Sequence, residues 1–160
     1  MSFQEAKLGK TKFVVQCAGV VFLLVAGTQI TVASDTDAAK QFGLIGSWAV
    51  DCEHPAGIGN PYQTFASSSD GSITLSMTDN IKGQDVLINI RDLKLVGTDM
   101  LSAAWSSAKS NGAMAVTLQK AGNKIHSWES LDATGKKLID KGLFVAAGKP
   151  APWATKCSPA

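Results

Sequence analysis

Apolar and polar residues alternate in short segments along the chain after Gly43, and turn-forming residues separate these segments. Alternation with a period of two is typical of half-buried β-strands, because successive side chains point to opposite faces. Turn signals recur about every 8 to 12 residues, as in an all-β meander, sandwich or barrel. The pattern predicts an all-β domain of roughly seven to nine antiparallel strands. Four sets of apolar residues would each share one strand face: Ile73, Leu75 and Met77; Val86, Ile88 and Ile90; Leu101, Ala103 and Trp105; Met114, Val116 and Leu118.

Two segments depart from simple alternation. After Ile90 the apolar phase slips by one residue, which predicts a bulge or bend near Arg91 and Asp92. Residues 137–145 predict either one irregular strand or two short strands that are split at Gly142. An antiparallel meander with these interruptions remains compatible with a closed barrel and, as the alternative, with a β-sandwich.

The residues that precede the first strand, 35–43, are mostly polar. They predict a short helical turn that Asp35 or Asp37 caps and that Gly43 ends. Residues 44–160 then form a single β-domain, because a chain of this length ordinarily folds as one unit with its own core.

The first 34 residues have the order of a secretory signal. Three lysines precede an apolar run over residues 13–26, and a weakly polar stretch leads to Ser34. Val32 and Ser34 are the small residues that a signal peptidase requires, so we predict that residues 1–34 are a signal peptide cleaved after Ser34. The alternative is an uncleaved membrane anchor, since residues 13–33 are 21 in number and a spanning helix needs about 20. In both cases the domain is exported to the periplasm or the medium, and only the leader would contact a membrane.

Removal of the leader changes the charge balance. The leader holds three of the 15 basic residues and one of the 13 acidic residues, so the remaining chain is neutral. A neutral chain disfavours a nucleic-acid partner. Acidic residues predominate in residues 35–99 and basic residues in residues 100–160, which predicts charge pairing between early and late strands. The alternative is a face for an anionic partner, formed by Lys120, Lys124, Lys136, Lys137 and Lys141.

Two cysteines remain after the leader, Cys52 and Cys157, and they are 105 residues apart. In an oxidising compartment we expect them to form a disulfide. Pro150 and Pro152 begin an extended tail to Cys157, and we expect the disulfide to tie this tail back to the first strand.

The predicted first strand begins with Gly46, Ser47 and Trp48. A Gly-x-Trp at the start of an all-β chain of this length resembles the lipocalin-like (calycin) families. The resemblance implies an eight-stranded up-and-down barrel with a ligand cavity, closed at one end by the tryptophan. In those families an arginine on a late strand lies against this tryptophan, whereas the only arginine here, Arg91, lies in the middle of the chain.

The first strand leads into a loop that is rich in proline and glycine and carries Asp51, Glu53 and His54. Loops of this kind often carry function. Consecutive strand residues point to opposite faces, so we do not expect these side chains to converge on a metal or on acid-base chemistry. The sequence contains no phosphate-binding loop, EF-hand or haem-attachment motif, and we expect no metal, cofactor or catalytic set.

These observations favour an exported, non-enzymatic binding protein. Its partner would be a small apolar ligand inside the barrel or another exported protein at the loops. The small residues Ser102, Ala103, Ala104, Ala113 and Ala115 indicate free space inside a barrel. An alternative is a periplasmic inhibitor of a secreted hydrolase that inserts residues 53–62 into the active site. The candidate ligand or partner contacts are Trp48, His54, Tyr62, Trp105 and Trp128.

Overall fold

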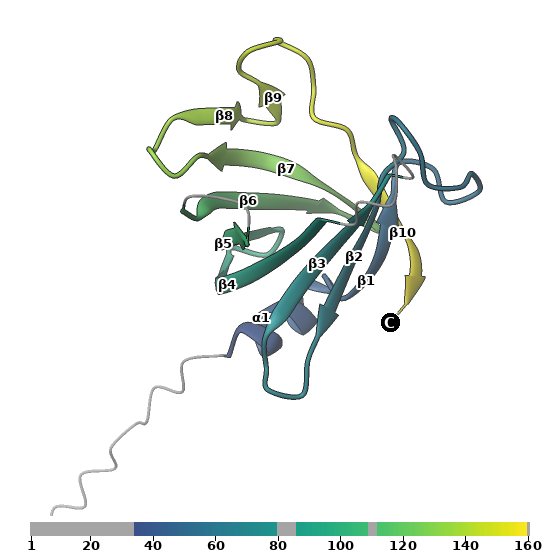
Figure 1. The fold of residues 1–160 in the computed structure, drawn as a ribbon, viewed down its shortest axis with the longest axis vertical. Coiled ribbons are helices and arrows are strands. Elements are labelled where there is room, and N and C mark those ends of the chain that lie inside the picture. The colour runs from purple at the N-terminus through teal and green to yellow at the C-terminus, as the bar shows by residue number, and fades with distance from the viewer. Residues whose placement is uncertain (1–33, 80–85, 109–111, 160) are drawn as a thin grey trace, which may run out of the picture. The chain divides into compact units, whose positions relative to one another are not determined.

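The computed structural model describes residues 34–79, 86–108 and 112–159. It confirms the all-β fold, in the form of a closed antiparallel barrel with one short helix (Figure 1). The predicted leader lies outside the described residues except for Ser34, and its cleavage stays a prediction. The elements are α1 (Asp35–Phe42), β1 (Gly46–Ala49), β2 (Tyr62–Ser67), β3 (Ile73–Thr78), β4 (Val86–Val96), β5 (Met100–Ser107), β6 (Met114–Ala121), β7 (Lys124–Leu131), β8 (Lys137–Asp140), β9 (Leu143–Phe144) and β10 (Ala154–Pro159).

The last strand, β10, closes the barrel. Strands β1 to β7 pair in chain order, and β10 pairs antiparallel with both β1 and β7. The predicted C-terminal tail is therefore a barrel strand, which extends the expectation that it returns to the first strand. Strands β8 and β9 continue from β7 outside this ring (Figure 1). They confirm the reading of residues 137–145 as two short strands, which are separated by Lys141 and Gly142.

Apolar side chains from the predicted alternating sets fill the barrel interior, which confirms the strand phases. Leu75 and Leu101 are almost fully buried, whereas Val86, at the start of β4, is 46% exposed. The predicted bulge also exists, because the pairing of β4 with β5 shifts between Arg91 and Lys94. The backbone N–H groups of Asp92 and Leu93 turn away from β5 and donate to the carboxylate of Asp35.

Helix α1 forms because its ends are well capped. Ser34 is the N-cap: its hydroxyl accepts a hydrogen bond from the Asp37 N–H, and the Asp37 carboxylate in turn accepts from Ser34. The N-cap predicted at Asp35 or Asp37 is wrong, because Ser34 holds that position. Asp37 takes part only as the third helical residue of the capping box, and Asp35 bonds to β4. Gly43 ends the helix in the left-handed conformation, as predicted. Because Ser34 is the cap, cleavage after Ser34 would remove it.

The helix plugs one end of the barrel. Ala38, Ala39 and Phe42 are buried in the barrel core, and Leu44 and Ile45 continue the contact after the helix ends. At the C-terminus of the helix, the Lys120 ammonium donates to the Phe42 carbonyl and the Lys156 ammonium to the Gly43 carbonyl. Cations are favourable at this negative end of the helix dipole. These two contacts join late lysines to backbone carbonyls, so they are not the charge pairs that were predicted between early and late strands.

Trp48 lies within the core next to this helix. It is 1% exposed, and its indole N–H donates to the Leu44 carbonyl over 2.7 Å. The ammonium of Lys156, on the last strand, lies 5.3 Å from the ring. A lysine therefore occupies the place that the lipocalin resemblance assigns to an arginine. Membership of those families stays a prediction.

The predicted disulfide between Cys52 and Cys157 is present, with Cα atoms 5.2 Å apart. It connects the loop that follows β1 to β10. A disulfide is consistent with an oxidising compartment such as a periplasm or the extracellular space. Within the described residues, the only helix is too short to cross a membrane.

Candidate functional site

Strand pairing is weakest where β7 separates from β10, a place that we call the seam. Only two residue pairs join these strands, Ile125 with Ala154 and Lys124 with Thr155. Beyond them β7 pairs with β8 instead. Along the rest of this edge β7 therefore faces β8 and Gly142 rather than a strand of the barrel ring.

A cavity of about 230 Å³ lies at the seam, toward the end of the barrel opposite α1. Its inner wall comes from the barrel core, including Met77, Trp105 and Leu118. Its outer wall comes from residues 137–152, which comprise β8, β9 and the segment that leads to β10, and which we call the flap. The lining residues are Gln63, Met77, Trp105, Leu118, Ile125, His126, Ser127, Ile139, Phe144, Ala151, Pro152 and Ala154.

Backbone hydrogen bonds hold the flap in place. The Gly142 N–H donates to the Trp128 carbonyl of β7, and the Gly142 carbonyl accepts from the Ala151 N–H. Gly142 thus connects β7 to the segment that leads to β10. The flap nevertheless presents apolar side chains to solvent, at 38–55% exposure: Leu138, Leu143, Phe144 and Val145.

His126 is the most enclosed polar side chain in the cavity wall. It is 9% exposed, and the Trp153 ring stacks on it with centroids 3.8 Å apart. Trp128 meets it edge-on at 6.2 Å. A Cβ added to Gly142 would lie 2.7 Å from the His126 Cε1 atom, so the flap backbone also presses on the ring. These contacts fix the orientation of the imidazole.

Burial lowers the pKa of His126 below its ordinary value, and the backbone of Ala151 opposes that shift only in part. The imidazole is therefore neutral at neutral pH. Its Nε2 lies 3.1 Å from the Gln119 Oε1. Its Nδ1 has no hydrogen-bond partner within the described part of the chain.

The five candidate contacts lie in three different places. Trp105 lines the cavity and meets Phe65 edge-on, with centroids 6.2 Å apart. Trp128 contacts His126 without lining the cavity, and Trp48 lies in the core beside α1. His54 and Tyr62 lie in and beside the β1–β2 loop. Their role as ligand or partner contacts stays a prediction.

Sequence reasoning missed the lining residues on β7. The pairing of β6 with β7 shifts at Thr117 and Leu118, which leaves Trp128 as an extra, unpaired residue. His126 pairs with Gln119 before this bulge, and Ser130 pairs with the core residue Val116 after it. His126 and Ser130 therefore lie on opposite faces of β7, whereas simple alternation would place them on the same face. The sequence contains one sign of this irregularity: polar residues stand at both even and odd positions of β7, so alternation does not show which face points inward.

The small residues expected inside the barrel are mostly elsewhere. Ala103 packs against the core, whereas Ala104 pairs with Ala115 on the outer face. Ser102 also alternates away from the core face, and Ala113 is exposed outside the strands. The cavity is therefore not a consequence of small interior residues. It results from the early separation of β7 from β10.

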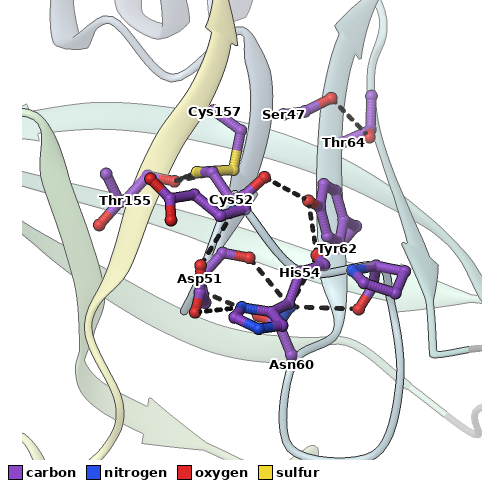
Figure 2. The surroundings of a disulfide bond; sticks show 11 residues. Ser47, Asp51, Cys52, His54, Asn60, Tyr62, Thr64, Thr155 and Cys157 are labelled. Atoms are coloured by element: carbon purple, nitrogen blue, oxygen red, sulfur yellow. Dashed lines mark hydrogen bonds and ion pairs between the residues drawn. A yellow bond between two sulfur atoms is a disulfide. The ribbon is translucent and has the colours of Figure 1, made fainter.

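The β1–β2 loop forms a second ordered site (Figure 2). The Asp51 Oδ2 and His54 Nδ1 atoms are 2.7 Å apart, so the prediction that these side chains point apart is wrong for this pair. The reason is that β1 ends at Ala49 and residues 51–54 form a turn. The N–H of Glu53, and then the His54 ring, lower the pKa of the Asp51 carboxyl.

The loop backbone is held from inside. The Asn60 side chain accepts a hydrogen bond from the Asp51 N–H and donates to the carbonyls of Asp51, His54 and Pro55. The Tyr62 hydroxyl donates to the carbonyls of Cys52 and His54 (Figure 2). The Asp51 and His54 side chains remain 47% and 73% exposed. Within the described residues, no group of three histidine, cysteine or acidic side chains could hold a metal ion. The Asp51–His54 pair braces an exposed loop.

Comparison with protein-family models, with curated proteins and with solved structures found no match for this chain. The candidate sites therefore rest on the geometry alone.

Proposed function

We propose that this chain is an exported, non-enzymatic binding protein that holds a small, largely apolar ligand in the seam cavity. The observation that supports the proposal is the cavity itself, which combines a wall of core side chains with a few polar groups, Gln63, His126 and Ser127. Ligand sites in proteins usually have this composition.

The size of the cavity limits the ligand. An apolar cavity of about 150 Å³ can hold benzene, and drug-sized ligands occupy roughly 300 Å³ or more. At about 230 Å³, the seam cavity suits a molecule of one or two rings or a short branched chain. The disulfide and the predicted leader favour a periplasmic or extracellular setting, in which such a protein would carry or sequester its ligand.

Native mass spectrometry of the protein purified from its host envelope tests this function. We expect a non-covalent adduct of low mass that is lost on unfolding. Trp105→Ala would enlarge the cavity and weaken retention of the adduct, whereas Ile58→Ser, in the β1–β2 loop, would leave retention unchanged. A protein that never carries an adduct and also binds no member of a panel of one- and two-ring compounds would refute the proposal.

The β1–β2 loop supports a second candidate function, binding of another exported protein, including inhibition of a secreted hydrolase. Ile58 is 88% exposed near the tip of a loop whose backbone Asn60, Tyr62 and the disulfide hold in place. A preformed loop loses little conformational entropy on binding, which favours affinity.

Replacement of the loop tip tests this second function. Ile58→Ser removes the exposed apolar contact without touching the braces, and Asn60→Ala loosens the loop without removing its tip. We expect both variants to lose the partner in a titration of the two purified proteins. Unchanged affinity in both variants would show that the loop is not the binding surface.

A further inference from the structure

The face of the β8–β9 hairpin that points away from the seam cavity is apolar. Ile139 and Phe144 pair with each other, and both line the cavity. The Val145 N–H donates to the Leu138 carbonyl, which extends this pairing by one residue. Side chains alternate between the two faces of a strand, so the apolar neighbours of the Ile139–Phe144 pair lie on the outer face. We call them the outer patch: Leu138, Leu143 and Val145, which are 38%, 46% and 55% exposed.

The turn that follows β9 satisfies much of its backbone within the hairpin. The Phe144 N–H donates to the Lys149 carbonyl, and the N–H groups of Ala147 and Gly148 both donate to the Phe144 carbonyl. Residues 143–148 contain no charged side chain. Contact with lipid favours such a segment, because lipid offers no hydrogen-bond partner to a backbone group.

Exposed lysines surround this apolar turn. Lys141 precedes it, Lys149 follows it, and Lys136 lies directly before β8. None of the three forms a salt bridge in the part of the chain that the structure describes. The one acidic residue of the flap, Asp140, is already bound by Lys137 at 2.9 Å. The outer patch is therefore flanked by positive charge that the flap itself does not neutralise.

Lys141 has a backbone conformation that lysine rarely adopts. Its φ is 49° and that of Gly142 is 76°, so both central residues of the turn between β8 and β9 are left-handed. Asn, Asp or Gly usually occupies the first of these two positions, because other side chains cost free energy there. A lysine at a strained position points to a use for its charge.

We propose that the flap docks on the surface of a lipid bilayer that contains anionic headgroups. The outer patch enters the interface between headgroups and acyl chains, and the flanking lysines bind the anionic headgroups. The outer patch faces away from the cavity, so this inference goes beyond the proposed function and does not depend on it. Docking would place the outer wall of the seam cavity at the membrane.

Two features favour a bilayer over another protein molecule as the occupant. A second copy of this chain would bring the same lysines against these lysines, and like charges across an interface are unfavourable. The outer patch consists of three side chains on a hairpin outside the barrel ring (Figure 1), whereas a stable protein interface involves about 20–30 residues on each side.

Co-sedimentation with lipid vesicles tests the inference. We expect the protein to bind vesicles of phosphatidylcholine that also contain phosphatidylglycerol, an anionic lipid. Binding to vesicles of phosphatidylcholine alone should be about tenfold weaker or more, because each lysine near an anionic surface contributes about fivefold. Added salt should weaken binding to the anionic vesicles. Equal binding to both kinds of vesicle, or binding to neither, would overturn the inference.

A matched pair of valine variants assigns the contact to the outer patch. Val145→Ser should weaken binding to the anionic vesicles about fivefold, because it removes apolar surface from the interface. Val96→Ser makes the same change at the end of β4, where the valine is 49% exposed, and should leave binding unchanged. Equal binding of the two variants would show that the outer patch does not contact lipid.

Lys141→Asn should change stability and binding in opposite directions. Asn is favoured in the left-handed turn position, so the midpoint of thermal unfolding should rise. Vesicle affinity should nevertheless fall about fivefold, and a more stable variant cannot lose binding by unfolding. Lys94→Asn removes an exposed lysine from β4 and should leave vesicle affinity unchanged. Wild-type affinity in Lys141→Asn would contradict the use proposed for its charge.

Lipids with brominated acyl chains locate the contact even if the leader also holds the protein on a membrane, because bromine quenches a tryptophan that touches it. Val145→Trp should gain fluorescence that these lipids quench, and Val96→Trp should not. Quenching in neither variant would show that lipid does not reach the flap. Analytical ultracentrifugation without lipid tests the rival occupant: a dimer that Val145→Ser abolishes would assign the outer patch to a second copy and overturn the inference.

Discussion

The two regions that close the barrel, the helix plug and the seam, differ in how they satisfy their polar groups. At the plug, the carbonyls of Phe42 and Gly43 accept hydrogen bonds from the ammonium groups of Lys120 and Lys156. The Asp35 carboxylate accepts hydrogen bonds from two backbone N–H groups of β4. At the seam, the flap leaves apolar side chains exposed and a buried imidazole nitrogen without a partner in the described chain.

This difference indicates that the free energy of unfolding depends mainly on the plug, and ligand binding mainly on the seam. The plug buries the aromatic ring of Phe42 and fixes the barrel, so changes there should affect the free energy of unfolding. At the seam the flap leaves apolar side chains exposed and a buried imidazole nitrogen lacks a partner among the described residues. Changes there should therefore affect ligand binding more than stability. Functional regions commonly come from the less stable part of a structure.

The largest expected effect comes from removing a ring at each region. Phe42→Ala should lower the free energy of unfolding by about 3–5 kcal/mol, because Phe42 is 1% exposed. Phe144→Ala, in the flap, should lower it by about 1 kcal/mol or less, because Phe144 is 39% exposed. Urea denaturation measures both values. Equal losses would show that the flap supports the fold as much as the plug does.

A smaller effect is expected from two glycines of the flap. Both Gly142 and Gly148 have positive φ, at 76° and 62°, so either alanine variant has a backbone cost of about 1–2 kcal/mol. Only at Gly142 would the new Cβ meet His126, at 2.7 Å, whereas nothing lies within 4 Å of it at Gly148.

Gly142→Ala should therefore destabilise the protein more than Gly148→Ala and should also disturb ligand binding. Thermal unfolding and titration with a compound from the panel of one- and two-ring compounds measure the two effects. Equal stability of the two variants would mean that the flap can move away from His126 without cost.

The smallest expected effect is a dependence on pH. The folded-state pKa of His126 lies below its ordinary value of 6.5, so the unfolded chain binds this proton first. The stability that neutral His126 provides is complete above about pH 6.5 and is lost as the pH falls from there through the lowered pKa.

The carboxyl groups whose pKa is lowered, such as Asp51 and Asp132, protonate in the unfolded chain around pH 3.8, so they contribute little to a comparison made well above that pH. Urea denaturation at about pH 7.5 and about pH 5.5 measures the His126 effect. His126→Phe should remove the difference, and a wild-type protein of equal stability at both pH values would contradict the assigned shift.

The sequence was sufficient for the all-β fold because local patterns encode it, although alternation alone left a barrel and a sandwich both possible. Alternation predicted the strands and the phase slip after Ile90 predicted the bulge in β4. The two cysteines that remain after the leader, in a chain predicted to be exported, predicted the disulfide. The helix cap was misassigned because Asp35 serves β4, a contact 57 residues away that no local pattern reveals.

The cavity was not predictable in the same way. It depends on how few residues of β7 pair with β10, and this length is set by the stagger of strands around a closed barrel. Sequence analysis did identify Trp105, which lines the cavity, but not His126, because the bulge at Trp128 changes which residues share a face. The position of the site is therefore determined by how β7 pairs with β6 and with β10, and β10 is distant from it in the sequence.

Crystals pressurised with xenon would show whether the seam holds a ligand cavity, because xenon enters apolar cavities. We expect a xenon atom at the seam, between Trp105, Leu118 and Phe144, and none beside Phe42 at the plug. A structure with no xenon at the seam and with side chains filling that space would contradict the claim that this protein keeps a ligand cavity there.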